Sequence, residues 1–194
     1  MDRVLITGAL GQLGSSLQNV FHDEGIFVIA TDIRDCPKNI KCQYEKLDAL
    51  SQDDILNIVK KYEINVIYHL VAILSAKGEK NPFRSWKINM ETFQNIIDVS
   101  IKCKIKKIFW PSSIAVFGKG SNLKYVPQNT YMDPTTVYGV SKLAGEKLVN
   151  YYFDKYELDI RSIRFPGIIS MGIKPGGGVT DYICLLYTSP SPRD

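Results

Sequence analysis

The sequence is poor in residues that bind metal ions or form disulfide bonds. It holds two histidines in 194 residues, and its four cysteines are Cys36, Cys42, Cys103 and Cys184. None of these cysteines stands in a CxxC pair. Zinc sites and disulfide frameworks depend on closely spaced groups of such residues. The sequence therefore predicts neither a metal site nor a disulfide-bonded fold.

Long apolar runs and a strong net charge are also missing. No apolar run approaches the roughly 20 residues that a membrane-spanning helix needs, and no signal or transit segment precedes the first expected strand. The net charge is only +4, and the basic run at 102–107 falls where a helix is expected to end, a place that lysines favour. We expect no membrane and no nucleic-acid partner. The chain as it stands is expected in the cytoplasm, or in mitochondria if a presequence is missing.

What the sequence does contain is an alternation of short apolar runs with longer amphipathic segments. Strands are expected near 3–7, 26–31, 43–47, 65–71, 107–111 and 159–165, and helices near 12–24, 52–62, 83–102 and 138–156. This alternation is typical of the α/β class with a doubly wound parallel sheet. Ligands of such sheets bind just past the carboxyl ends of the strands.

A glycine-rich turn follows the first expected strand and opens the first helix. Gly8, Gly11 and Gly14 have the spacing GxxGxxG, and glycines in such a turn let backbone N–H groups approach a pyrophosphate. The turn alone is a weak signal. Asp32 ends the next strand about 20 residues further on, where a dinucleotide-binding unit places the acid that binds the adenosine ribose. A carboxylate favours NAD over NADP, although Arg34 nearby keeps NADP open as an alternative.

Two residues at the start of the last expected helix have the spacing of a general base and its activator. Tyr138 and Lys142 are four residues apart, so a helix places both side chains on one face. A lysine ammonium favours the phenolate and is expected to lower the tyrosine pKa from about 10. A phenol tuned in this way can take a proton from an alcohol. Ser113, just after the fifth strand, is a candidate to hydrogen-bond the same substrate oxygen.

Together these residues resemble the extended branch of the short-chain dehydrogenase/reductase superfamily, which includes the sugar-nucleotide epimerases. The marks of the branch are the glycine turn, the segment Ser-Ser-x-x-x-Phe-Gly at 112–118 and Tyr-x-x-x-Lys. Within the branch, the chain is similar to the epimerase-like L-threonine 3-dehydrogenases over roughly residues 3–182. The similar segments are 69–82, 111–118, 132–142, 161–170 and 175–182.

This resemblance implies an NAD(P)-binding Rossmann fold and the NAD-dependent oxidation of L-threonine to 2-amino-3-oxobutanoate. Ser113, Tyr138 and Lys142 would be the catalytic residues, with Tyr138 as the base. The implied cofactor contacts are Gly8, Gly11, Gln12, Leu13, Gly14, Asp32, Asp48, Ala49, Leu70, Ala72, Tyr138, Lys142 and Pro166. The implied substrate contacts are Ser75, Ser113, Tyr138 and Thr180.

The resemblance also implies that the full-length parent forms a homodimer through the helices at 83–102 and 138–156. Their apolar positions fit such an interface, and they fit equally well a role in covering the sheet. These positions are Phe93, Ile96, Ile97, Leu143, Leu148 and Tyr152.

The end of the chain departs from the family that it resembles. We expect residues 1–182 to form an NAD-binding domain with the catalytic residues, and the Ser/Pro-rich segment 183–194 to be a non-native or disordered tail. Most of the lobe that closes over the substrate would then be missing. The chain is therefore expected to bind NAD with weak or no turnover.

Three other functions are weighed against threonine oxidation. A dehydratase is disfavoured, because Ile114 and Ala115 follow Ser113 where dehydratases of this branch carry acidic residues. A sugar-nucleotide epimerase uses the same three catalytic residues and stays open, as does an NAD-binding fragment without catalytic activity.

Overall fold

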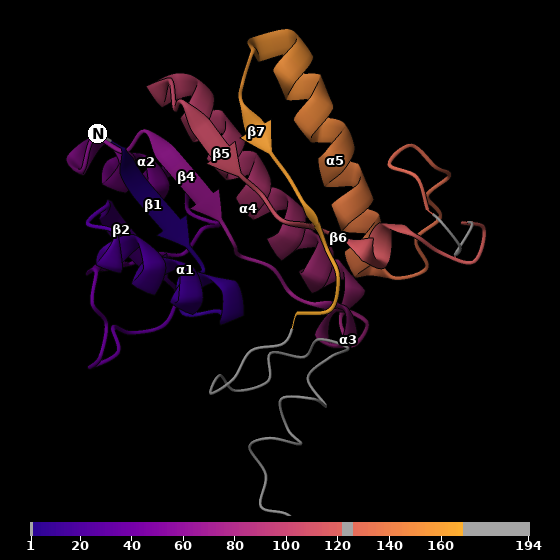
Figure 1. The fold of residues 1–194 in the computed structure, drawn as a ribbon, viewed down its shortest axis with the longest axis horizontal. Coiled ribbons are helices and arrows are strands. Elements are labelled where there is room, and N and C mark those ends of the chain that lie inside the picture. The colour runs from indigo at the N-terminus through magenta and orange to yellow at the C-terminus, as the bar shows by residue number, and fades with distance from the viewer. Residues whose placement is uncertain (1, 122–125, 169–194) are drawn as a thin grey trace, which may run out of the picture.

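The computed structural model describes residues 2–121 and 126–168, so Thr180 and the segment 183–194 lie outside the described residues. The helices are α1 (Gln12–Asp23), α2 (Gln52–Lys61), α3 (Ser75–Gly78), α4 (Pro82–Cys103) and α5 (Val137–Tyr156), with a 3-10 turn η1 (Ile114–Val116). The strands are β1 (Arg3–Thr7), β2 (Phe27–Asp32), β3 (Gln43–Lys46), β4 (Val66–His69), β5 (Lys107–Phe109), β6 (Ser112–Ser113), β7 (Ile160–Arg161) and β8 (Arg164–Phe165). Figure 1 shows α4 and α5 side by side.

Six of the strands form one parallel sheet with the order β3-β2-β1-β4-β5-β7. The chain moves outward from β1 to β3 and then returns to β4 on the other side of β1, so the strand order reverses between β1 and β4. The prediction of a doubly wound parallel sheet is confirmed. A reversal of this kind leaves a crevice at the carboxyl ends of the two central strands, where ligands of open α/β sheets bind.

The strand expected at 107–111 ends early, at Phe109, and the strand expected at 159–165 is divided into β7 and β8. Trp110 and Pro111 separate β5 from β6, and β6 pairs with β8 in a small second sheet. Proline has no backbone N–H and cannot donate to a strand ladder, which explains the interruption. The backbone N–H groups on either side still pair, because Trp110 N donates to the carbonyl of Arg161 and Ser112 N to that of Ile163, both at 2.9 Å. The expectation of unbroken strands at 107–111 and 159–165 was wrong in this respect, and the short α3 was missed.

Apolar side chains pack on both faces of the sheet. On one face Leu5, Ile29, Ile67 and Ile108 are fully buried beneath α2, α4 and α5. On the other face a smaller cluster around Val4, Ile6 and Val28 packs against α1. Successive strand residues point to opposite faces, so neighbouring positions along one strand contribute to different clusters.

The apolar positions that fitted a dimer interface are mostly occupied inside the chain. Phe93, Ile96 and Ile97 are fully buried against the sheet, and Leu148 and Tyr152 pack at the edge of the same cluster. In the described part of the chain, no helix is long and apolar enough to cross a membrane.

Candidate active site

The glycine turn lies between the carboxyl ends of β1 and β4. Gly8 has a φ of +72°, and a Cβ there would lie 3.0 Å from the backbone of Leu70. At Gly14 a Cβ would come within 2.5 Å of the carbonyl oxygen of Gly8. Only glycine tolerates both the conformation and the close approach. Gly11 precedes α1, and no side chain caps the first turn of that helix.

Asp32 lies at the carboxyl end of β2, beside the glycine turn. Its side chain is 7% exposed. Its Oδ2 accepts the backbone N–H of Leu10 at 3.1 Å, and its Oδ1 accepts that of Arg34 at 3.2 Å. Burial acts to raise the pKa of this carboxyl, but the hydrogen bonds from Arg34 and Leu10 outweigh burial and lower the pKa. Asp32 is therefore a carboxylate fixed next to the turn.

The structure joins the glycine turn, at the start of α1, to the segment after β8 that contains Pro166. The side-chain amide of Gln12, at the start of α1, donates to the carbonyl of Ile168 at 3.2 Å. Pro166 stands two residues before this contact and is exposed. Leu70 N donates to the carbonyl of Thr7 at 3.0 Å, which places the β4 end against the β1 end.

The remaining predicted cofactor contacts follow β3 and β4. Asp48 is exposed, and its Oδ1 accepts the backbone N–H of Leu50 at 3.0 Å. Ala49 is buried, with its carbonyl held by Asn95 at 3.1 Å. Ala72 is half-buried in the connection that follows β4. All of these residues lie past the carboxyl ends of strands, as the sheet class requires.

Ser113, Tyr138 and Lys142 come together where β6 meets the first turns of α5. Thr136 caps this helix, and its hydroxyl accepts the backbone N–H of Gly139 at 3.0 Å. Ser113 and Tyr138 interact through their side chains. Lys142 Nζ lies 5.5 Å from the centre of the Tyr138 ring. The spacing of four residues therefore places both side chains on one side of the helix, as the sequence predicts.

The charge state of these groups differs from the expectation in one respect. Burial raises the pKa of the Tyr138 phenol, and the hydrogen bond with Ser113 offsets only part of this rise. Lys142 has a pKa lowered by burial to about 7, and its Nζ donates to the carbonyl of Pro111 at 2.6 Å. The expectation that Lys142 lowers the tyrosine pKa is therefore wrong for the chain without ligands, because this lysine is buried and aimed at the backbone.

The same helix carries a second tyrosine-lysine pair with the same spacing, and its surroundings are different. Tyr151 is 48% exposed, and its hydroxyl accepts from Lys155 Nζ at 2.9 Å. Among the described residues, no serine hydroxyl pairs with Tyr151. Burial beside Ser113, and not the spacing alone, distinguishes Tyr138 and Lys142 from this exposed pair.

The residues present fit a dinucleotide at the carboxyl edge of the sheet. The first turn of α1 has no side-chain cap and opens beside a turn built from glycine, an arrangement that suits a pyrophosphate. The fixed carboxylate of Asp32, at the end of β2, lies beside this turn. The tyrosine-lysine pair is carried by α5, which follows β5 and β6 along the chain.

Comparisons with known proteins agree with this geometry. Residues 4–187 match the model of the NAD dependent epimerase/dehydratase family. The chain belongs to this family. The family's cofactor is NAD, which confirms the cofactor prediction.

Individual relatives narrow the similarity. An uncharacterized epimerase/dehydratase of Staphylococcus haemolyticus is 42% identical over 96% of this chain and 60% of its own length. The L-threonine dehydrogenase of Clostridium difficile superposes with a TM-score of 0.91 at 41% identity, over 96% of this chain and 60% of that one. The GalE-like L-threonine dehydrogenase of Cupriavidus necator, in its holo form, gives a TM-score of 0.90 at 39% identity, over 93% and 59%. The chain thus spans about 60% of the length of these relatives.

One buried polar residue, Asn89, supports the site of this family member and was not singled out from the sequence. Asn89, in α4, accepts the N–H of Ile73 at 2.7 Å and donates to its carbonyl at 3.1 Å and to Ser141 Oγ at 3.3 Å. It therefore ties the connection after β4 to both long helices. Ser75 lies at the end of this connection, in α3, which is joined to α5 by a bond from Val137 N to Glu79 at 2.9 Å.

His69, at the end of β4, is a core residue. It is 1% exposed, and its ring contacts the hydroxyls of Thr7 at 2.7 Å and Thr92 at 3.1 Å. Thr92 donates its own proton to the carbonyl of Ile88 at 2.6 Å, so it accepts from Nε2–H. With a pKa of about 3, the ring is neutral near pH 7, and Nδ1 then accepts from the hydroxyl of Thr7. Burial lowers its pKa to about 3, helped by the charge of Lys142.

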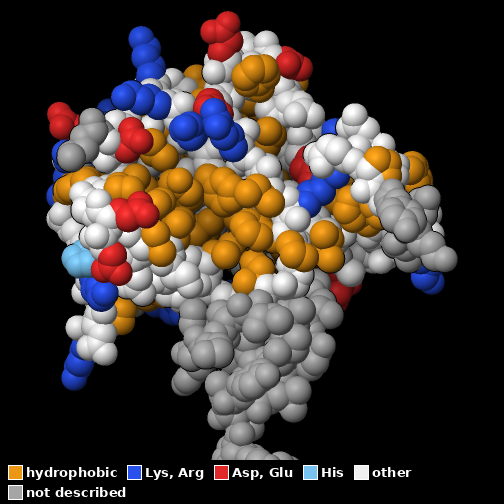
Figure 2. Space-filling model, viewed as in Figure 1, with side chains coloured by type: hydrophobic (Ala, Val, Ile, Leu, Met, Phe, Trp, Pro, Cys, Tyr) orange, Lys and Arg blue, Asp and Glu red, His pale blue; other side chains and the backbone are white. Residues whose placement is uncertain are grey.

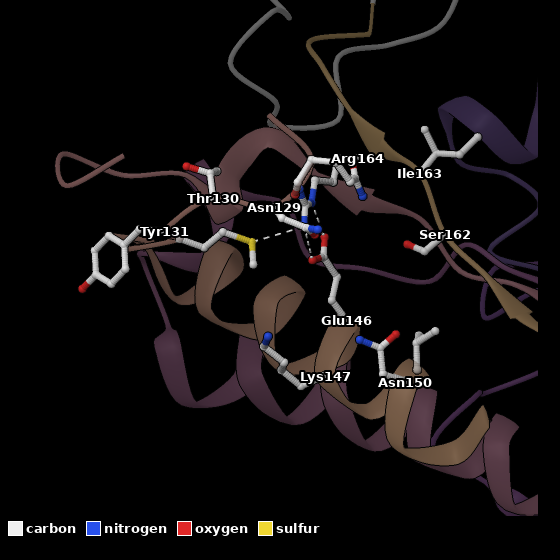
Figure 3. A pocket seen from close by; sticks show the side chains of 12 residues that line it. Asn129, Thr130, Tyr131, Glu146, Lys147, Asn150, Ser162, Ile163 and Arg164 are labelled. Atoms are coloured by element: carbon white, nitrogen blue, oxygen red, sulfur yellow. Dashed lines mark hydrogen bonds and ion pairs between the residues drawn. The ribbon is translucent and has the colours of Figure 1, made fainter. Parts of the chain in front are cut away.

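A cavity of about 1000 Å³ lies beside α5 and is lined by none of the predicted site residues. Figure 3 shows Arg164 reaching across it to Glu146. This ion pair has both side chains less than 20% exposed, with an Nη2–Oε2 distance of 2.8 Å. Glu146 also accepts the hydroxyl of Ser112 at 2.6 Å. The cavity thus contains the polar network that joins β6 and β8 to α5, one turn beyond Lys142.

Proposed function

We propose that the whole protein oxidises L-threonine to 2-amino-3-oxobutanoate with NAD, and that Tyr138 is its catalytic base. We also propose that this 194-residue chain binds NAD with weak or no turnover. The observation that carries the proposal is the group of Ser113, Tyr138 and the buried Lys142 beside a dinucleotide-binding edge. The named activity of two structures near 40% identity supports L-threonine as the substrate.

The residues divide the work of an alcohol oxidation. NAD, when bound, supplies the acceptor for the hydride that leaves the carbon bearing the hydroxyl group. Ser113 orients the substrate hydroxyl, and Tyr138 takes its proton while the carbon–oxygen double bond forms. Lys142 is proposed to favour the deprotonated phenol only in the complex with NAD, because in the chain without ligands its Nζ donates to the carbonyl of Pro111. Ser75 and Thr180 are proposed to hold the amino-acid end of the substrate.

The pKa of Tyr138 makes the proposal dependent on pH. Burial holds this residue as the neutral phenol in the chain without ligands. Only the phenolate can accept the proton of the substrate. We therefore expect the rate of threonine oxidation to rise with pH as the phenol loses its proton.

The experiment measures NADH formation from L-threonine by the protein expressed from the complete gene and by this chain, together with NADH binding to both. Tyr138→Phe should lower the rate by about 10²- to 10⁴-fold, the usual range for a general base. Tyr151→Phe is the matched control, because it alters a tyrosine of the same helix with the same lysine spacing. It should leave the rate unchanged.

Several results would contradict the proposal. Full activity in Tyr138→Phe would remove the assigned base, and conversion of a sugar nucleotide such as UDP-glucose instead of L-threonine would identify an epimerase. Threonine oxidation by the 194-residue chain at an ordinary enzyme rate would contradict weak turnover. The division of the chain at 182/183 is tested by sequencing the genomic locus, where an uninterrupted exon encoding 183–194 would overturn it.

A further inference from the structure

The face of the Trp110 ring lies against the ammonium group of Lys142. The distance from Lys142 Nζ to the centre of this ring is 4.3 Å. An aromatic face attracts a cation within about 6 Å, and tryptophan does so most strongly. The same Nζ donates to the carbonyl of Pro111 at 2.6 Å. The segment between β5 and β6 thus holds the buried lysine of α5 with both a ring face and a carbonyl.

Close packing from both long helices fixes the ring of Trp110. The ring is stacked on that of Phe93 in α4, with a centroid distance of 4.6 Å and an angle of 19°. Gly145 in α5 makes room for it, because a Cβ there would lie 2.2 Å from the indole ring. Trp110 itself is 2% exposed. The ring is therefore a preformed surface under the lysine.

The acidic side chains of the described residues leave the charge of Lys142 unbalanced. Glu146, one turn further along α5, is paired with Arg164, and burial is the cause of the lowered pKa of Lys142. The other titratable neighbours are Tyr138 on the same helix, whose pKa burial raises, and His69 on β4, whose pKa is about 3. Both are neutral near pH 7. A buried charge in such surroundings needs compensation from dipoles or ring faces.

We propose that Trp110 is a positioning residue for Lys142: its ring keeps the ammonium charged and holds it beside Tyr138, whose ring centre lies 5.5 Å from Nζ. This inference rests on the proposed role of Tyr138 as the base, which needs a charged lysine once NAD is bound. A ring that acted only by excluding water would have the opposite effect, because desolvation disfavours the charged form. The two effects differ in sign, so one measurement separates them.

The experiment replaces Trp110 by tryptophan carrying one, two or three fluorine atoms, which weakens the negative charge of the ring face and changes its size little. Trp86→Phe makes Trp110 the single tryptophan of the 194-residue chain. NMR of lysines labelled at the ε carbon follows the titration of Lys142, whose signal is identified by its absence in Lys142→Arg. The midpoint should fall with each fluorine, to about a tenfold lower protonation constant with three.

The second tryptophan provides a matched control. Trp86 lies in α4 and is 42% exposed. In a chain with Trp110→Phe, fluorination of Trp86 should leave the midpoint of Lys142 unchanged. A midpoint that stays the same or rises when Trp110 is fluorinated would mean that the ring acts only by excluding water, and the inference would be wrong.

The protein expressed from the complete gene tests the consequence for the reaction. Fluorination of Trp110 should lower the rate of threonine oxidation more in alkaline than in neutral buffer, because Lys142 then loses its proton at a lower pH. The KM for threonine should stay unchanged. An equal loss at every pH would assign the ring a structural role only. A complete protein that does not oxidise threonine contradicts the proposed function, whereas the lysine titration still decides whether Trp110 holds the charge.

Discussion

The two faces of the parallel sheet differ in how completely helices cover them. On one face α2, α4 and α5 bury a continuous cluster in which Ile67 and Ile108 are fully inaccessible. On the other face, α1 is the one helix among the described elements that packs on the sheet. Beyond α1 a row of aromatic rings runs across the strands, from Tyr68 to Phe109 to Phe165, with centroid distances of 5.5 and 6.4 Å. These three rings are only partly buried.

The face covered by α2, α4 and α5 holds most of the buried core, whereas part of the face beside α1 is left accessible. Helix α5, which carries Tyr138 and Lys142, and Asn89 of α4 both lie on the covered face. Figure 2 shows apolar side chains gathered in a band across the middle of one face of the molecule. Contiguous apolar surface of this kind is uncommon on soluble monomers.

The largest expected effect comes from neighbouring residues of β5 that point to opposite faces. Ile108→Ala should cost about 2–5 kcal/mol of unfolding free energy, because it leaves a cavity in a closely packed core. Phe109→Ala should cost about 1–2 kcal/mol, because its ring is only partly buried. Chemical denaturation of both variants measures the two costs. Equal costs would mean that the second face is as well packed as the first.

A smaller effect is expected from acid, through the buried His69 of the covered face. Its pKa is about 3 in the folded chain and about 6.5 when unfolded, so below pH 6.5 the unfolded chain binds a proton that the folded chain excludes. Its contribution to stability is complete above pH 6.5 and declines as the pH falls toward 3, by roughly 3 kcal/mol at pH 4. His69→Gln should flatten this decline in denaturation measured from pH 7 to pH 4.

The control for this measurement is His22→Gln, which alters an exposed histidine in α1. Its acid dependence should match that of the parent. An unchanged slope in His69→Gln would show that other groups cause the loss of stability in acid.

The smallest expected effect concerns the aromatic row itself. If these rings form accessible apolar surface, the parent chain should bind the dye ANS, and Phe109→Ser should reduce its fluorescence about twofold. Phe153→Ser removes an exposed phenylalanine of α5 as a control and should have little effect. The same fluorescence in both variants would place the dye elsewhere on the molecule.

Several elements follow from local sequence because their causes are local. The helix at 52–62 begins at the capping residue Ser51 and ends among lysines, as its pattern indicates. The strand ends that carry Gly8 and Asp32 are likewise set by short apolar runs followed by glycine or a polar residue. The division of β5 from β6 is different, because Pro111 interrupts a ladder whose partner strand lies some fifty residues away.

For the candidate site, the sequence located the groups but not their electrostatic state. The spacing of Tyr138 and Lys142 follows from helix geometry, and it is equally true of Tyr151 and Lys155. Which pair is buried depends on Trp110, whose ring lies 4.3 Å from Lys142 Nζ, and on Ser113. Both of these come from a distant segment of the chain.

By itself, the sequence determined the doubly wound sheet, the family and its NAD cofactor, and the positions that face the carboxyl edge. These depend on apolar periodicity, glycine turns and fixed spacings, which act over a few residues. Only the tertiary structure decided that burial leaves Lys142 with a pKa of about 7, that Arg34 occupies Asp32, and that Glu146 joins Ser112 to Arg164. Burial and ion pairing depend on which segments meet in space, and a single chain sequence does not state those distances.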